Sequence, residues 1–255
     1  MTDRPIVFVT EGGAHIWAII NSLTDRFGPI SVVLETPYSK RELLMRRARK
    51  LGWFSVAGQL GTMVLVRLGK SLFNGSIRKI VAAEGLKTEP RPDQEIIHVG
   101  SADTRELVDI VRNREPAVVF LAGCRLLSAN TLSQITCPVI NYHAGINPKY
   151  RGMNGGYWAL ATGDRGNFGS TVHLVDTGVD TGAVLHQSRG APGPGDNIAS
   201  YAMRQAAFSR DICTRAVEDA LAGSLKPVDT GLPSQQWYHP TLWSYLWTGI
   251  RRGVW

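Results

Sequence analysis

Three kinds of polar side chain in the second half of the sequence could together transfer an acyl group to an amine. Asn141 and His143 supply an amide and an imidazole, and Asp176 and Asp180 supply carboxylates about 35 residues later. An amide and a protonated imidazole can both donate to an oxygen that gains negative charge in a tetrahedral intermediate. A carboxylate can keep the imidazole charged, or relay the amine proton directly or through a water molecule. The set therefore suits acyl transfer to nitrogen.

Several other chemistries are not expected. None of the Ser, Cys or Lys residues lies in a recognisable nucleophile motif, so a covalent enzyme intermediate is not predicted. The pair Gly12-Gly13 lacks the dinucleotide-binding spacing, which argues against a nicotinamide cofactor. Cys124, Cys137 and Cys213 are far apart and form no CxxC, a pattern typical of reduced cysteines in a cytoplasmic protein and not of a disulfide or metal site.

Bulk composition is that of an ordinary globular protein with a basic surface. Of the 255 residues 44% are hydrophobic, and the formal net charge is +7. A basic surface attracts phosphorylated small molecules, nucleic acid or acidic lipid headgroups, and charge alone does not choose among them. The polar stretch Met1–Pro5 leads directly into a short apolar run, so we expect no signal peptide and a cytoplasmic protein.

The elements that must position these residues alternate between apolar strands and helices. We predict strands at 6–9, 30–34, 117–122 and 138–140, and helices at 16–20, 41–51, 103–114 and 197–221, the last with Asp196 as N-cap. This order predicts an α/β fold with a mostly parallel twisted sheet and helices on both faces. Because ligands bind beyond the carboxyl ends of such strands, Gly12-Gly13, Gly123 and Asn141–His143 should converge on one crevice.

Two segments are additional to a minimal α/β domain. We predict a catalytic domain over 1–222 with a helical insert at about 53–80, followed by an aromatic and basic tail over 223–255. Trp53–Phe73 carries no charge before Arg67, but glycines interrupt it and it is short for a membrane span. Our favoured interpretation is that insert and tail cap the core. The alternative is an interfacial patch that makes peripheral membrane contact.

The spacing of several short motifs resembles that of a known family. These motifs are Asn141-x-His143, Pro148–Gly152, Gly169–His173 and Gly178–Gly182. Their order and spacing are similar to those of the folate-dependent formyltransferases, which include the glycinamide ribonucleotide, methionyl-tRNA and sugar N-formyltransferases. The resemblance runs from residue 6 to about residue 221 and is densest over 118–185. It implies a Rossmann-like formyltransferase fold and an enzyme that moves a formyl group from N10-formyltetrahydrofolate to a primary amine.

The resemblance also implies roles for individual residues. Asn141, His143 and Asp180 match the catalytic residues, and Asp176 is a competing carboxylate in the loop of Asp180. Residues implied for the cofactor pocket are Arg125, Leu126, Leu127, Asp176 and Val179. Residues implied for substrate binding are Gly12, Gly13, His15, Tyr150, Arg151 and His173, of which His173 could equally be structural. No metal is expected.

The acceptor amine is the least determined part of the prediction. Glu11 lies in the loop that binds phosphate in ribonucleotide-specific relatives, where it would repel a phosphate. The run Arg46–Lys50 is either a solvated face or a contact for a nucleotide diphosphate, a lipid headgroup or tRNA. Only about 34 residues follow Leu221, too few for the C-terminal β-barrel of methionyl-tRNA formyltransferases, so no nucleic-acid partner is expected.

These considerations favour an amino sugar attached to a nucleotide as the small-molecule acceptor. Another small amine such as a purine precursor, a non-catalytic folate-binding protein and a non-folate hydrolase remain as alternatives. Sugar-modifying relatives often dimerise, so a homodimer is also compatible with the resemblance.

Overall fold

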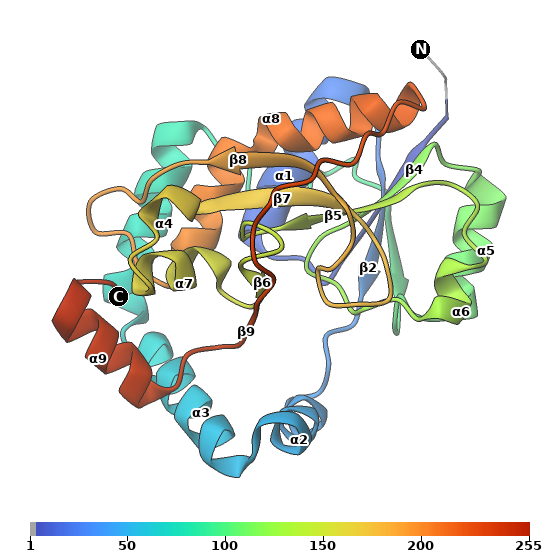
Figure 1. The fold of residues 1–255 in the computed structure, drawn as a ribbon. Coiled ribbons are helices and arrows are strands. Elements are labelled where there is room, and N and C mark those ends of the chain that lie inside the picture. Colours follow the sequence, from blue (N-terminus) through green and yellow to red (C-terminus); the bar gives the residue numbers. More distant parts are fainter. Residues whose placement is uncertain (1–3) are drawn as a thin grey trace.

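The computed structural model describes residues 4–255, without the side chains of residues 40 and 70–74 (Figure 1). Residues 1–3 of the polar start, and the side chain of Phe73 at the end of the predicted insert, lie outside this description. The described chain is built around a seven-stranded sheet in the order β3-β2-β1-β4-β5-β7-β8. The first five strands in this order run parallel, and β7 is antiparallel to both of its neighbours.

The strands of the sheet are β1 (Ile6–Thr10), β2 (Ser31–Glu35), β3 (Ile96–Val99), β4 (Val118–Leu121), β5 (Val139–His143), β7 (Gly169–Leu174) and β8 (Val184–Arg189). The helices are α1 (Ala14–Phe27), α2 (Lys40–Leu51), α3 (Trp53–Leu68), α4 (Lys70–Glu84), α5 (Arg105–Arg114), α6 (Ala129–Leu132), α7 (Gly155–Ala161), α8 (Tyr201–Leu221) and α9 (Leu242–Arg252), with a 3-10 turn at Arg165–Asn167. Two short strands, β6 (Arg151–Gly152) and β9 (Gln236–Trp237), form a separate pair.

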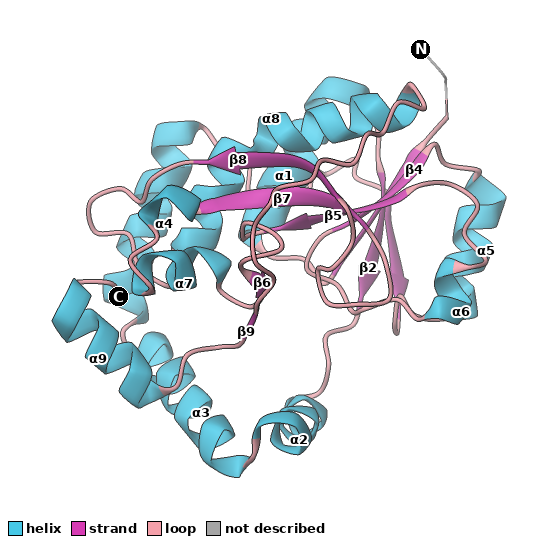
Figure 2. Cartoon of the chain, in the orientation of Figure 1, coloured by secondary structure: helices cyan, strands magenta, loops and turns pink. Residues whose placement is uncertain are grey.

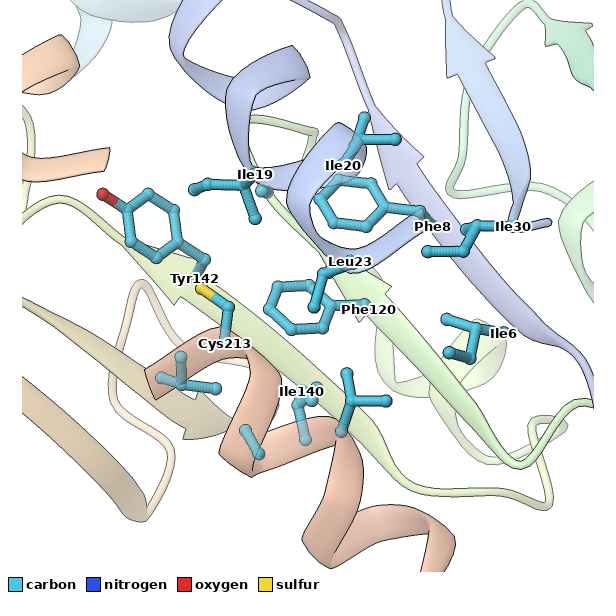
Figure 3. Close-up of a cluster of buried hydrophobic side chains, with 14 of the residues drawn as sticks. Ile6, Phe8, Ile19, Ile20, Leu23, Ile30, Phe120, Ile140, Tyr142 and Cys213 are labelled. Carbon is cyan, nitrogen blue, oxygen red and sulfur yellow. The ribbon is translucent and has the colours of Figure 1, made fainter. Parts of the chain in front are cut away.

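Helices cover both faces of the large sheet, so the predicted α/β class is confirmed (Figure 2). Alternate residues of β1 and β4 point to opposite faces, as strand geometry requires. On one face Phe8 and Phe120 stack with ring centroids 5.0 Å apart, beneath α1 and beside Cys213 of α8 (Figure 3). On the other face valines of β1 pack against Leu107 and Val111 of α5.

Two details differ from the sequence prediction. Asn141 and His143 do not follow a strand but belong to β5, because that strand continues in pairing with β7 up to His143. The last long helix begins at Tyr201, and Asp196 is not its N-cap. The Asp196 carboxylate instead accepts from the Gly193 N–H at 2.7 Å and from Arg204 Nε at 2.8 Å, so it closes the preceding turn.

The predicted insert corresponds to α3 and α4, and the tail contains β9 and α9. Gly58 of α3 lies so close to Trp243 of α9 that an added Cβ would be 2.4 Å from the indole ring. Phe54 stacks on the same indole at 4.5 Å. Among the helices of the described chain, none has the length and apolar character needed to cross a bilayer. The division into a catalytic domain and a tail stays a prediction.

Candidate active site

The candidate site lies where the strand order reverses. β1 pairs with β2 on one side and with β4 on the other, and the crevice beyond the carboxyl ends of such strands is the usual ligand site of open α/β sheets. The turn after β1 and the turn after β4 are joined there by a hydrogen bond from Glu11 N–H to the Gly123 carbonyl at 2.9 Å. Asn141 and His143 end the next strand, β5, at the same edge.

The structure brings Asn141, His143 and Asp180 together. Asp180 Oδ1 lies 3.4 Å from Asn141 Nδ2, and Asp180 Oδ2 lies 3.5 Å from His143 Nδ1. The Gly152 N–H donates to Asp180 Oδ2 at 2.9 Å, and His173 Nε2 lies 3.5 Å from Oδ1. The carboxylate of Asp180 is therefore the common centre of the cluster, although it comes from a loop and the other side chains come from β5 and β7.

The backbone of Asp180 has the left-handed conformation, with φ of 50°. This region is sparsely populated by residues with a side chain, and Asp and Asn are among those that tolerate it best. Asp176 stabilises the loop, because its Oδ1 accepts from the Gly178 N–H at 2.9 Å and from Thr181 Oγ1 at 2.6 Å. The loop thus turns Asp180 inward and leaves Asp176 exposed.

The electrostatics favour an ionised Asp180. Burial by itself raises the pKa of this carboxyl, but His143, His173 and the Gly152 N–H outweigh burial and hold its pKa below the ordinary value. A carboxylate with a low pKa is a good partner for an imidazolium and a weak base. Asp180 is therefore better suited to orient the His143 and His173 imidazoles and stabilise positive charge on them than to retain a proton.

Both ring nitrogens of His143 face acceptors. Nε2 donates to the Tyr150 carbonyl at 2.7 Å, while Nδ1 faces Asp180 at a distance longer than a good hydrogen bond. A ring protonated at both nitrogens would have an acceptor at each, and its Nδ1–H could still be shared with a substrate oxygen. Gly145 makes this placement possible, since an added Cβ there would be 2.4 Å from Nε2 and 2.5 Å from the Tyr150 carbonyl oxygen.

Asn141 is held by the strand opposite it. It lies directly across from His173 in the β5–β7 pairing, and its Nδ2 is 3.0 Å from His173 Nε2. His173 Nδ1 donates to the Leu174 carbonyl at 2.6 Å, so Nε2 is the nitrogen that faces both the Asn141 amide and the Asp180 carboxylate. His173 therefore positions Asn141, and one N–H of the amide remains for Asp180 or for an oxygen brought into the site.

Two cavities border this cluster. The larger, of about 330 Å³, is lined by His143, His15, Gly152 and the aromatic rings of Tyr157 and Tyr201, among others. The smaller, of about 60 Å³, contains Asn141, His173 and Asp180 in its wall. Members of the polar cluster thus line both spaces, His143 the larger and Asn141, His173 and Asp180 the smaller.

The residues predicted for the cofactor pocket mostly line the smaller cavity. Arg125, Leu126, Leu127 and Asp176 are in its wall. Val179 is not; its carbonyl accepts from Arg151 Nη1 at 2.8 Å and so anchors the Asp180 loop.

The residues predicted for substrate binding divide between the larger cavity and the framework. His15 lines the cavity, and burial lowers its pKa to about 4. Gly12 and Gly13 precede α1 with positive φ and are not in the cavity wall. Tyr150 is buried, and its hydroxyl bonds to Thr162 and Asp164. Arg151 likewise binds protein groups, Ser234 and Val179.

Sequence reasoning missed four residues near the site. Two of them, Asn154 and Tyr157, line the larger cavity, and Asn154 has the left-handed conformation with φ of 56°. Asn154 Nδ2 and Tyr157 Oη have no hydrogen-bond partner among the described residues. Asn154 could have been identified from the turn signal Asn154-Gly155-Gly156, which comes shortly after the Pro148–Gly152 motif. Gln205 also lines this cavity and is bonded to the Gly169 carbonyl at 2.5 Å.

The fourth missed residue is Glu35, at the carboxyl end of β2. Its side chain is fully buried and accepts from the backbone N–H groups of Ala102 and Arg125, at 2.8 Å and 2.5 Å. The Arg125 guanidinium is 3.6 Å away and stacks on Tyr38. Glu35 therefore fixes the start of the loop over the smaller cavity, and its place just after an apolar run was the available signal.

The fold and the site define an α/β protein with a buried polar cluster at the strand-order reversal. The chain belongs to the formyl transferase family, whose model matches residues 68–217, more than half of its length. A methionyl-tRNA formyltransferase of Synechocystis is 34% identical over 110 residues, which are 43% of this chain and 33% of that protein. The chain spans between a third and about half of the length of the curated relatives with this name that it matches.

Solved structures with the same fold include enzymes named for different acceptors. A phosphoribosylglycinamide formyltransferase from Anaplasma phagocytophilum aligns with a TM-score of 0.58 and 18% identity, over 90% of this chain and 93% of that one. A sugar N-formyltransferase from a Shewanella species aligns with a TM-score of 0.57 and 14% identity, over 91% and 76%. At these identities the likeness extends to the fold alone.

Proposed function

We propose that this protein transfers a formyl group from N10-formyltetrahydrofolate to the primary amine of an amino sugar attached to a nucleotide. The observation that carries the proposal is the Asn141–His143–Asp180 cluster, whose members line two cavities. Membership in the formyl transferase family supports the reaction class. The amino sugar is our choice of acceptor.

In the proposed reaction the co-substrate supplies a formyl carbon already activated by its bond to nitrogen. The Asn141 amide and the Nδ1–H of His143 donate to the formyl oxygen as it gains negative charge. Asp180 stabilises the charged imidazole across 3.5 Å. The acceptor nitrogen bonds to the formyl carbon, and the bond from that carbon to N10 of the co-substrate breaks. Because the pKa of Asp180 is low, it acts mainly by orienting a water molecule, through which the amine proton passes to the departing nitrogen.

The smaller cavity fits the chemistry of a pterin ring but not its size. Its wall combines apolar side chains with Asn141 and the backbone of the loop after β4. At about 60 Å³ it is well below the several hundred Å³ usual for a ligand of that kind. Leu126 is more than half exposed beside it, so we expect Leu126 and the 176–180 loop to move outward when the co-substrate binds.

The larger cavity supports an uncharged acceptor moiety. None of the described residues that line it is a lysine or arginine, and Tyr157 and Tyr201 offer rings on which a sugar could stack. Glu11 precedes the helix N-terminus that would otherwise attract phosphate. Burial and the nearby Glu35 raise the pKa of Glu11, which means that the surroundings disfavour negative charge, and they would disfavour an added anion for the same reason. A nucleotide diphosphate would extend outward towards Arg47, whose Nη2 is 3.6 Å from Met153 at the cavity wall.

A panel of acceptors tests the proposal. The protein is incubated with N10-formyltetrahydrofolate and, separately, nucleotide-linked amino sugars, glycinamide ribonucleotide and methionyl-tRNA, and products are weighed by mass spectrometry. We expect a mass gain of one formyl group on an amino sugar nucleotide. Faster formylation of either other acceptor would refute the choice of substrate, and release of free formate with every acceptor unchanged would refute transfer itself.

A further inference from the structure

Helix α3 exposes most of its large apolar residues, and apart from Val56 its buried residues are small or polar. Trp53 and Leu68 have exposed fractions of 64% and 79%. The residues turned towards the protein include Gly58, Gln59 and Thr62, all buried. Thr62 Oγ1 donates to the Pro240 carbonyl at 3.0 Å. An amphipathic helix on the surface of a globular protein normally has the opposite orientation, so the outer side of α3 is suited to an apolar environment.

Helix α9 also exposes large apolar residues. Trp247 and Ile250, at 62% and 77% exposure, lie on its outer side, while Tyr245, Thr248 and Gly249 are buried. The two helices pack together, and the stack of Phe54 on Trp243 connects their outer sides. In Figures 1 and 2 α2, α3 and α9 lie together below the sheet. We call the exposed apolar side chains of α3 and α9 the α3–α9 face.

Positive charge is concentrated on the same three helices. Residues 40–68 and 242–252 contain nine of the 28 lysines and arginines and one of the 21 acidic residues, Glu42. The rest of the chain therefore has 19 basic and 20 acidic residues and is nearly neutral. Arg49 and Arg67 are exposed, as are Arg251 and Arg252 at the end of α9. The α3–α9 face thus has cationic surroundings.

This combination selects one kind of partner. A two-fold contact between copies of the chain through this face would bring two strongly cationic regions together, which is unfavourable. An anionic lipid surface instead accepts tryptophan and aliphatic side chains at the boundary of its acyl layer and attracts lysine and arginine to its headgroups. We propose that the α3–α9 face docks peripherally on a membrane surface that contains anionic lipids.

Co-sedimentation of the purified chain with vesicles tests this docking. We expect the protein to pellet with vesicles of phosphatidylcholine and phosphatidylglycerol at low salt, and to bind about tenfold more weakly to phosphatidylcholine alone. High salt should release it, since the electrostatic part is screened.

Two double variants separate the apolar and the charged contributions. Trp247→Ser with Ile250→Ser, and Arg49→Glu with Arg67→Glu, should each weaken binding about tenfold or more. All four side chains are exposed, so the thermal unfolding midpoint should stay close to that of the unaltered protein. Val228→Ser, at an exposed apolar residue outside the three helices, is the matched control and should bind normally.

Three results would overturn the proposal. The protein could stay in the supernatant with both kinds of vesicle at low salt, or it could bind both kinds equally at every salt concentration. A Trp247→Ser and Ile250→Ser variant that converts a dimer to a monomer, with vesicle binding absent throughout, would show instead that the face joins two copies of the chain. None of these measurements depends on formyl transfer.

Discussion

Replacing Asp180 with asparagine should remove most of the catalytic activity and leave the fold intact. Asparagine has nearly the same shape, tolerates the left-handed backbone conformation and can still accept from the Gly152 N–H. What disappears is the charge 3.5 Å from His143 Nδ1. Opposite unit charges at that distance attract by about 5 kcal/mol at an effective dielectric constant of about 20.

That attraction sets the expected loss of rate. Positioned acid–base and charge-pair assistance contributes about 10²–10⁴-fold, or about 3–5 kcal/mol of transition-state stabilisation, which agrees with the electrostatic figure. We therefore expect kcat/KM to fall by about a thousandfold, mainly through kcat, because the interaction strengthens as the formyl oxygen becomes charged. The assay is product formation with whichever acceptor of the panel is formylated.

Asp176→Asn is the matched control, because it makes the same change in the same loop at an exposed carboxylate. Its kcat/KM should fall less than about tenfold, because the substitution only weakens the turn that Asp176 forms with Gly178 and Thr181. An Asp180→Asn protein with activity within about threefold of the unaltered one would refute the roles assigned here. A large loss for Asp176→Asn alone would transfer the catalytic role to that residue.

Three further perturbations follow from the structure. Gly145→Ala places a Cβ 2.4 Å from His143 Nε2 and should cost about 1–3 kcal/mol of unfolding free energy, measured by urea denaturation, with a parallel loss of activity. Burial lowers the pKa of His15 from 6.5 to about 4, so the unfolded chain binds more protons between these values and stability falls as pH drops through that window. The loss is at most about 3 kcal/mol, and His15→Gln should flatten this part of the pH profile. Glu35→Gln turns an amide N–H towards a backbone N–H and removes the carboxylate charge 3.6 Å from the Arg125 guanidinium, so it should cost about 3 kcal/mol of unfolding free energy.

Each of these expectations has a contradicting result. An unchanged urea midpoint in Gly145→Ala would mean that His143 can move without cost. A pH profile of His15→Gln parallel to that of the unaltered protein between pH 4 and 6.5 would assign the dependence to another group. Glu35→Gln with full stability would show that the contacts of this carboxylate contribute little to the free energy of unfolding.

The sequence alone was sufficient to predict the α/β class and the elements near the site, because continuous apolar runs and glycine turns have local causes. It was not sufficient for the ends of β5 and α8. Asn141 pairs with β4 as well as with β7, and His143 joins the strand through its pairing with β7, some 30 residues later. Asp196 has the residue type of an N-cap, but its carboxylate is already engaged by Arg204, eight residues further along.

The site was predictable in its residue types and less so in its connections. The spacing of the motifs indicated Asn141, His143 and Asp180. No spacing rule could indicate that the Tyr150 carbonyl binds His143 or that the Tyr150 ring is buried. Likewise Arg151 was a substrate candidate by type, and its contacts with the Asp180 loop depend on how two distant segments pack. Tertiary contacts, not local propensity, decide such roles.

The pairing of β6 with β9 has a consequence for how this chain can diverge from its relatives. Trp237 of the C-terminal segment lies so close to Gly152 that any Cβ there would be 2.4 Å from the Trp237 carbonyl oxygen, and the Gly152 N–H is the one that binds Asp180. Replacing residues 236–255 with another terminal segment would therefore also change the position of the Gly152 N–H and of the Asp180 carboxylate that it binds. Natural or engineered chimaeras should keep their function only when the strand around Gly152 and the terminal segment are inherited together.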